Sequence, residues 1–402
     1  MKRLRNPTIV LASALLTAAG CGFQPQPGML TLRLDPSSVE ALAEAPGKAQ
    51  ELEALLVKHF GTRAGPRYEL LEGWTKEGVD PNHPERELTG GARAEFSPER
   101  WAQIVADNRQ RLAYEIAHAS GAEEQARLAN RYPSLVVSAE LYRVECLHCH
   151  GTEGGGDGET GRTLNPKPRD FRKGIFKYTA VKDQAHPRRE DLNEILERGI
   201  DGTAMPSFAR LSLAEREGLV DYVRLLALRG EVEALLVAGF KDEEAIDEAT
   251  AADAIDTVWG RWERAKDKLV AFAGEIPADT PERRARGREL FLDEKKGNCV
   301  SCHGPEGHGD GPAVFKTNAR GERTPAYQDA WGFDILPRDL TAGVFHGGSR
   351  PIDIYRRIYA GINGTPMPGI GEAKDAEGQP LLTNDDLWSI VHYVRSLSAR
   401  AP

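Results

Sequence analysis

The sequence has 402 residues, 40% of them hydrophobic and 28% charged, which is the composition of a globular protein able to bury a sizeable core. This length suggests two to three domains. A formal net charge of −9 argues against a nucleic-acid partner and favours docking to a basic patch on a partner protein.

The first residues have the pattern of an export signal. Three basic residues precede an apolar stretch over residues 8–19, which is shorter than the roughly 18 residues needed to span a membrane. The stretch ends in Ala18-Ala19-Gly20-Cys21, which resembles a bacterial lipoprotein signal, although Ala18 stands where such signals usually have Leu. The resemblance implies a signal peptide over 1–20, lipidation of Cys21 and a membrane-anchored protein on the periplasmic side. Ordinary secretion, with Cys21 as a spare thiol, is the alternative.

Residues 21–137 contain no motif with evident chemistry and are expected to form a tether and a helical extension. A stretch rich in Gln, Pro and Gly precedes a short helix that Ser37 or Ser38 is expected to cap. A second helix is expected over residues 49–60, where apolar residues recur at helical spacing, and a third after the N-cap candidate Ser97. We expect this extension to pack on the unit that follows it.

Two copies of the motif C-x-x-C-H give the sequence its main chemical signature. Their cysteines and histidines are Cys146, Cys149 and His150 in the first copy, and Cys299, Cys302 and His303 in the second. Thiols three residues apart in a helical turn reach the two vinyl groups on one porphyrin edge, and the adjoining histidine can ligate the iron. A thioredoxin-type pair or a zinc site would not explain a histidine after both pairs. The motifs therefore predict two covalently bound haem c groups.

The residues around the two motifs are also repeated. The matching segments are 156–158 with 309–311, 168–171 with 337–340, 174–176 with 343–345, 199–206 with 361–368, and 219–224 with 390–395. Such matching at corresponding positions is the sign of a duplicated domain. The sequence predicts one haem unit over 138–230 and another over 284–402, with a charged helical connector over 231–283 whose tryptophans pack against one or both units.

Two methionines occupy equivalent places in the repeat. Met205 and Met367 each lie in a Gly-rich loop before a proline, and the chain has only four methionines. Their matched positions favour a role as the second axial ligand of each iron rather than as core filler. A thioether ligand raises the reduction potential, and an iron with both axial positions filled serves electron transfer rather than catalysis.

Arginines and aromatic residues also match between the units. Arg169 and Arg338 can each bind a haem propionate with paired donors or pair with the aspartate that follows, and both interpretations remain open. Each unit is expected to end in a capped amphipathic helix. The aromatic on that helix, Tyr222 or Tyr393, is expected to meet the aromatic before the motif (Tyr142 or Phe291).

These motifs resemble the class I c-type cytochromes in a tandem di-haem form. The resemblance implies an all-α fold, with a helix before each haem motif that crosses the final helix of the unit. The longer pattern is similar to exported bacterial di-haem cytochromes of respiratory chains, and to the haem domains of cytochrome subunits of cbb3-type oxidases. It implies an electron carrier, not an enzyme, that passes single electrons from a respiratory donor complex to a terminal oxidase or reductase. The second unit has extra residues after its motif, including Trp331, which are candidates for partner-specific contacts.

Two other functions fit the same motifs. A di-haem peroxidase-like enzyme would need Met205 or Met367 to leave its iron, because such an enzyme keeps one distal position open. A cytochrome subunit held permanently in an oxidase or dehydrogenase complex would use the same chemistry as a free carrier. The sequence contains no Ser/His/Asp set or phosphate-binding loop that would support a hydrolase or a transferase.

Overall fold

The computed structural model describes residues 32–63, 66, 118, 121, 135–241, 245–272 and 274–398. Its regular structure is mainly helical, which confirms the predicted all-α class. The α-helices are α1 (Pro36–Ala41), α2 (Pro46–Phe60), α6 (Leu135–Glu145), α7 (Leu147–His150), α8 (Arg189–Arg198), α9 (Leu213–Lys241), α10 (Glu248–Glu263), α11 (Pro281–Leu292), α12 (Val300–His303), α13 (Pro351–Ala360) and α14 (Asn384–Ser398). The 3-10 turns are η4 (Gly161–Thr163), η5 (Phe171–Lys173), η6 (Arg264–Lys268), η7 (Pro312–Val314) and η8 (Leu340–Ala342).

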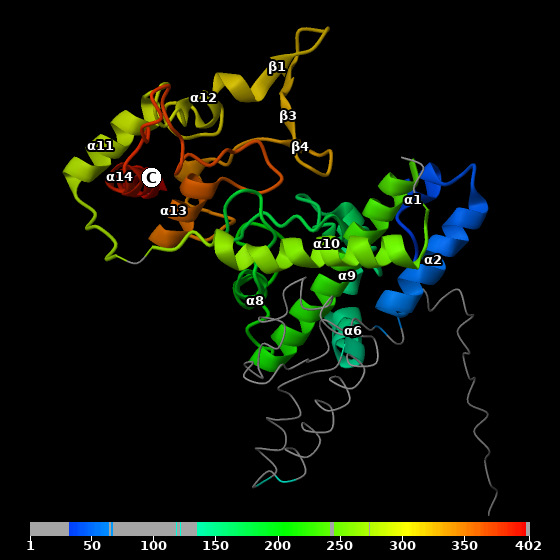
Figure 1. Cartoon of the computed structure of the whole chain (residues 1–402). Helices are drawn as coiled ribbons and strands as arrows, with labels where there is room; N and C mark the ends of the chain where they lie inside the picture. Colours follow the sequence, from blue (N-terminus) through cyan, green and yellow to red (C-terminus); the bar gives the residue numbers. More distant parts are fainter. Residues whose placement is uncertain are drawn as a thin grey trace, which may run out of the picture.

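The order of elements repeats along the chain. Helices α6 and α7, turn η5 and helices α8 and α9 follow one another in the first unit, and α11, α12, η8, α13 and α14 follow in the same order in the second. Figure 1 shows the second unit, in yellow to red, beside the first, in green. The repeated order agrees with the duplication inferred from the sequence.

In each unit the helix before the motif crosses the final helix, and both expected aromatic contacts are confirmed. The ring centroids of Tyr142 and Tyr222 are 5.0 Å apart, and those of Phe291 and Tyr393 are 5.3 Å apart. At the crossing in the second unit, a Cβ atom on Gly287 would lie 2.0 Å from a backbone carbonyl oxygen of α14. A glycine is therefore needed there for the two helices to approach this closely.

Reciprocal caps start the final helices, as predicted. The backbone N–H of Glu215 donates to Ser212 Oγ at 3.2 Å, and the backbone N–H of Ser212 donates to the Glu215 carboxylate at 2.7 Å. Thr383 and Asp386 form the same pair of bonds before α14. These bonds satisfy backbone donors that the first turn of a helix leaves without partners.

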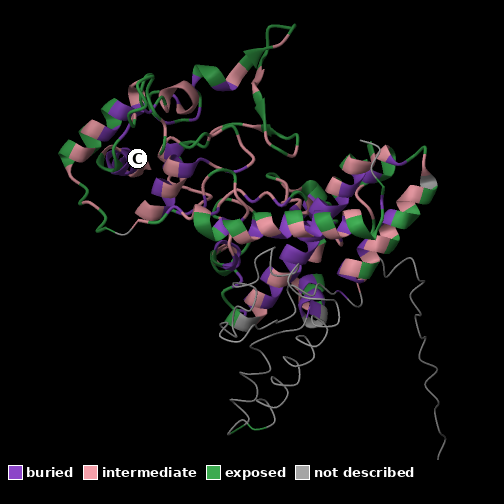
Figure 2. Cartoon of the chain, in the orientation of Figure 1, coloured by how far each residue is buried: buried purple, intermediate pink, exposed green. Residues whose placement is uncertain are grey.

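The connector is built onto the first unit. Helix α9 has 29 residues and continues past residue 230, where the sequence predicts the unit to end. Helix α10 packs against α9, and Figure 2 shows buried residues along it. Trp259 and Trp262 are among these buried residues. Trp262 Nε1 donates to Glu231 at 2.8 Å, and its ring meets the ring of Phe176 edge-on at 6.3 Å. These contacts confirm that the connector's tryptophans pack on a haem unit.

The described part of the N-terminal extension also packs on the first unit, as expected. Leu52, Leu56 and Phe60 of α2 are fully buried in the same core as α6 and α9. The cap of α1 was predicted wrongly: Asp35 accepts from the backbone of the next turn, because the helix already begins at Pro36. The helix expected after Ser97, the signal peptide and Cys21 lie outside the described residues. None of the helices in the described ranges has the length and apolar character required to cross a bilayer.

The two units meet through equivalent loops. A Cβ atom on Gly202 would lie 2.6 Å from Val344 Cγ1 of the second unit. Conversely, a Cβ atom on Gly364 would lie 3.0 Å from Ile175 Cγ2 of the first unit. The two glycines match each other in the repeat, as do Ile175 and Val344, so the contact is reciprocal. Each methionine loop therefore lies against the other unit.

The extra residues of the second unit form two short antiparallel hairpins, which we call the insertion (residues 315–335). Strand β1 (Phe315–Thr317) pairs with β2 (Arg323–Pro325), and β3 (Tyr327–Gln328) pairs with β4 (Asp334–Ile335). Trp331 lies on the turn between β3 and β4 and contacts the first unit of the same chain. Tyr327 and Phe333 of the insertion remain exposed to solvent.

Candidate functional site

The first C-x-x-C-H motif forms a single helical turn. The backbone N–H groups of Cys149 and His150 donate to the carbonyl oxygen of Cys146 at 3.1 and 2.9 Å. The two cysteines form no disulfide, and burial is the largest of the effects that raise the pKa of the Cys146 thiol to about 12. A thiol with so high a pKa is protonated at neutral pH, unlike the reactive thiolate of a thioredoxin-type pair. The turn instead suits attachment of both sulfurs to one ligand edge.

The second motif has the same backbone. The N–H groups of Cys302 and His303 donate to the carbonyl oxygen of Cys299 at 3.2 and 2.7 Å. Each motif ends at a glycine with positive φ, 76° at Gly151 and 73° at Gly304. This conformation favours glycine and turns the chain sharply after the histidine. The two motifs therefore present their thiols and histidines in the same way.

The imidazole of His150 is oriented for metal ligation. Its Nδ1 lies 3.1 Å from the carbonyl oxygen of Arg169, and its ring stacks on Phe171 with centroids 4.5 Å apart. A carbonyl partner requires the proton on Nδ1, which leaves the Nε2 lone pair available to iron. Burial lowers the pKa of His150 to about 4, so the ring is neutral at physiological pH. These features fit a proximal haem ligand.

His303 lies in an equivalent position but is held less firmly. Burial lowers its pKa, and the carbonyl of Arg338, which matches that of Arg169, partly opposes this effect. Its Nδ1 is nevertheless buried without a hydrogen bond of normal geometry. The ring lies near Phe291, with centroids 6.3 Å apart. The residue is half-buried, and its place after the second C-x-x-C pair matches that of His150 in the first motif.

The two methionine loops share a hydrogen-bonding pattern that depends on a threonine. In the first loop Thr203 Oγ1 donates to the carbonyl oxygen of Ile200 at 2.8 Å and accepts from the N–H of Met205 at 3.1 Å. Thr365 makes the corresponding bonds around Met367, at 2.8 and 3.3 Å. Both methionines are half-buried. The repeated G-T-x-M-P sequence is the signal from which the role of these threonines in holding the loop could have been predicted.

Neither arginine candidate pairs with the aspartate that follows it. Asp170 forms a two-bond ion pair with Arg172, at 2.9 and 2.8 Å. The guanidinium carbon of Arg169 lies instead 3.5 Å from the centre of the Trp331 ring. Arg338 extends toward the other unit, where its guanidinium would meet a Cβ atom on Gly202 at 3.3 Å. Both arginines therefore lie at the boundary between the units.

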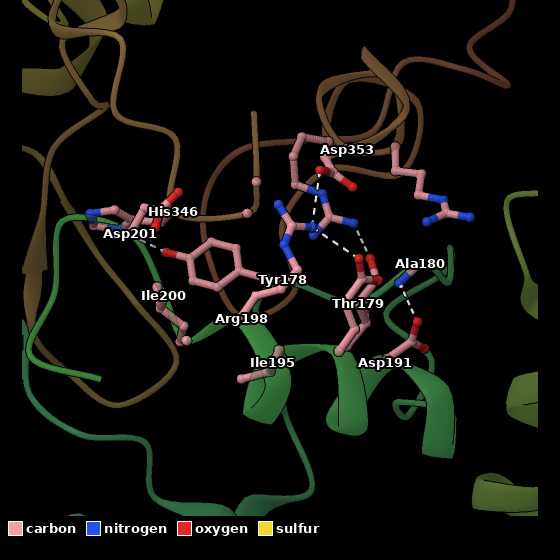
Figure 3. Close-up of a pocket in the computed structure, with 16 residues that line it drawn as sticks. Tyr178, Thr179, Ala180, Asp191, Ile195, Arg198, Ile200, Asp201, His346 and Asp353 are labelled. Carbon is pink, nitrogen blue, oxygen red and sulfur yellow. Dashed lines mark hydrogen bonds and ion pairs between the residues drawn. The ribbon is translucent and has the colours of Figure 1, made fainter. Parts of the chain in front are cut away.

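A small polar cavity of about 80 Å³ also lies at this boundary, between α8 and α13 (Figure 3). Tyr178 Oη lies 3.1 Å from His346 Nδ1 at one side of it, which joins the two units. Arg357, from α13, donates to the carbonyl oxygen of Thr179 at the other side. None of the predicted cysteine, histidine or methionine ligands lines this cavity.

The described residues do not form a zinc site. No group of three or more His, Cys, Asp and Glu side chains in this part of the chain is arranged to hold a metal ion. The two C-x-x-C pairs therefore remain separate, each beside its own histidine.

Two family models match the sequence. Residues 284–398 match the model described as Cytochrome c, and residues 137–223 match that of Cytochrome C oxidase, cbb3-type, subunit III. Among solved structures, a chain of the reducing HAO-like protein complex of Kuenenia stuttgartiensis is similar, with 28% sequence identity and a TM-score of 0.47. That match covers 65% of this chain and 94% of the other. A comparison with curated proteins finds no match.

Proposed function

Because the chain is a c-type cytochrome with two cytochrome c domains in tandem, we propose that it carries single electrons through two low-spin haem c groups. The cytochrome c domains indicate covalently bound haem c and electron transfer. The number of haems, their ligands and the partners are our proposal. When bound, the haem iron supplies a one-electron couple.

The equivalence of the two units carries this proposal. Each has the same motif turn, a histidine at the equivalent position and the same threonine-held methionine loop. In the first unit the cysteine thiols would form the thioether links, and His150 and Met205 would ligate the iron. In the second unit His303 and Met367 would do the same. Arg169 and Arg338 would bind propionates, and neither forms an ion pair with the aspartate that follows it.

The position of the units supports a relay within one chain. Each methionine loop lies against the other unit, and both arginines lie at the boundary between them. A redox partner could therefore deliver an electron to one unit while a second partner removes one from the other. We propose a respiratory donor complex and a terminal oxidase or reductase as these partners.

A spectrum of the holoprotein tests the function. We expect a reduced-minus-oxidised difference spectrum of two thioether-linked low-spin haems that carbon monoxide does not change. A high-spin haem, or one that binds carbon monoxide, would contradict the proposal for that unit. It would favour a peroxidase-like enzyme in which one methionine leaves its iron.

A fixed place in a larger complex is the second candidate. The match of residues 137–223 to a subunit of cbb3-type oxidases favours it. Purification from membranes in mild detergent separates the two: a fixed subunit elutes with stoichiometric partner chains, and a mobile carrier elutes alone.

A lipid anchor on the periplasmic side completes the proposal. It is supported by the resemblance of residues 1–21 to a lipoprotein signal. The variant Cys21→Ser should leave the membrane fraction and appear in the soluble periplasmic fraction, and its persistence in the membrane would contradict the anchor.

A further inference from the structure

Trp331 contacts two segments, one from each candidate haem site. One is the segment of the first unit that orients His150, and the other is the loop of the second unit that carries Met367. Its Nε1 donates to the carbonyl oxygen of Asp170, at 3.3 Å, in the first unit. On the second unit, a Cβ atom on Gly364 would lie 2.8 Å from Trp331 Cζ3, and Gly364 belongs to the loop that carries Met367. The indole therefore fills the gap between segments that belong to two candidate haem sites.

Trp331 also contacts Arg169, which is a candidate propionate ligand of the first unit. The guanidinium carbon lies 3.5 Å from the ring centre, within the range of a cation–π contact. The same residue, Arg169, supplies the carbonyl that orients His150. Trp331 therefore contacts both the backbone carbonyl of Asp170 and the charged guanidinium of Arg169, in the segment that lies beside His150.

The turn that carries Trp331 is itself fixed to the first unit. Asp329 accepts from the backbone N–H of Trp331 at 3.0 Å and pairs with Lys177 Nζ at 2.8 Å. Lys173 Nζ donates to the carbonyl oxygen of Ala330 at 2.8 Å. The indole position is thus determined by bonds on both sides of the residue.

The two units differ at this point. Arg169 is half-buried, and burial lowers its pKa to about 10, whereas the matching Arg338 is exposed. The insertion occurs only in the second unit, so its tryptophan covers the arginine of the first unit while no matching residue covers Arg338. A positive charge shielded from water acts more strongly on a neighbouring redox centre than one in water.

We propose that Trp331 is a positioning residue that holds Arg169 against the first haem and thereby raises the reduction potential of that haem alone. The proposal rests on the proposed function, because it assumes a haem in the first unit. A nearby cation disfavours the extra positive charge of ferric iron. Loss of the indole lets water screen Arg169, and the potential of the first haem falls.

Two substitutions of similar size test the role of the aromatic face. Trp331→Leu removes the π-system, and Trp331→Phe keeps it. In a redox titration of the holoprotein, we expect Trp331→Leu to raise the oxidised-to-reduced ratio of the first haem about threefold at a fixed solution potential. Trp331→Phe should keep the ratio close to that of the wild type, because it retains an aromatic ring. Phe333→Ala is the matched control, because Phe333 lies on the same hairpin but is 48% exposed.

A double-mutant cycle separates positioning of Arg169 from general docking of the units. If Trp331 acts through Arg169, then Trp331→Leu has no further effect on the potential in an Arg169→Gln background. The first haem is identified as the one whose potential changes in Met205→Ala. An unchanged potential in Trp331→Leu, an equal shift of both haems, or additive effects in the double variant would each overturn the proposal. A wild-type protein without two low-spin haems would instead refute the proposed function.

Discussion

Lys177 Nζ lies 2.8 Å from Asp329 Oδ2, and the two side chains are only 11% and 6% exposed. This ion pair joins the first unit to the insertion of the second. A nearly buried ion pair therefore contributes to the interface between the units. Removing one charge of such a pair lowers the free energy of unfolding more than removing both, because it leaves the other charge buried without a partner.

The variant Asp329→Asn should lower the free energy of unfolding by about 3 kcal/mol, because it leaves the Lys177 ammonium buried without a counter-charge. Urea denaturation followed by circular dichroism measures this. The double variant Lys177→Met with Asp329→Asn is the control and should recover most of the loss, because it removes the unpaired ammonium and keeps an acceptor for the backbone N–H of Trp331. A cost below about 0.5 kcal/mol for the single variant would mean that the pair behaves as an exposed one.

Removal of either methionine thioether should open one iron and leave the other unchanged. Met205→Ala and Met367→Ala should each keep two covalently attached haems, lower one reduction potential and allow carbon monoxide to bind one haem. Each variant is the control for the other, because the affected haem should differ. If carbon monoxide binds to neither variant, the methionines are not the axial ligands.

The close contact at Gly202 should make that glycine harder to replace than a similar one elsewhere. Gly202 and Gly378 have φ values of 71° and 79°, so an alanine pays about the same backbone cost of roughly 1–2 kcal/mol at each. A Cβ atom on Gly202 would also lie 2.6 Å from Val344, whereas nothing lies within 4 Å of one on Gly378. Gly202→Ala should therefore lower the free energy of unfolding by about 1 kcal/mol more than Gly378→Ala. Equal costs in thermal denaturation would show that the two units are not in contact at this point.

The sequence predicts what depends on local spacing. The motif turns, the caps at Ser212 and Thr383 and the aromatic contact of Tyr142 with Tyr222 all follow from residues at fixed short offsets or from the repeat, and the structure contains each of them. The cap of α1 could also have been predicted, because a proline at the first helical position indicates that the preceding Asp35 is the cap.

Contacts between the units could not be predicted in this way. Trp331 and Arg169 lie in different halves of the chain, and neither periodicity nor a motif connects them. Only the packing of the two units brings an insertion of one against the arginine of the other. The continuation of α9 beyond residue 230 has a similar cause, because α10 supplies the tertiary burial that favours a longer helix.

Acid should weaken the interface between the two units, because it protonates the carboxyl group of Asp353. Burial alone would raise the pKa of this carboxyl, but Arg350 and Arg198 outweigh burial and hold it below the ordinary value of 3.8. The stabilisation is therefore fully present above pH 3.8 and is lost as the pH falls through the lowered pKa. Arg198 belongs to the first unit and lies 3.3 Å from Asp353, so the interface loses a contact.

Unfolding measured between pH 7 and pH 2.5 tests this. Asp353→Asn should be less stable than the wild type at pH 7, and the difference should shrink below pH 3.8 until the two proteins converge. Asp253→Asn, on the exposed face of α10, should follow the wild-type curve throughout. A difference that stays constant with pH would contradict the assignment.

The unbroken helix α9 has made the two copies of the duplicated domain unequal. Helix α14 spans Asn384–Ser398, whereas α9 continues past residue 230, packs against α10 and buries Val232 and Leu236 in the core of the first unit. A protein truncated at the end of the first repeat would therefore contain only part of α9, with an apolar surface exposed to solvent. Recombination that replaced the first repeat with the second would leave α10 without the surface on which it packs. Exchange of the first repeat for the second would therefore remove the packing between α9 and α10.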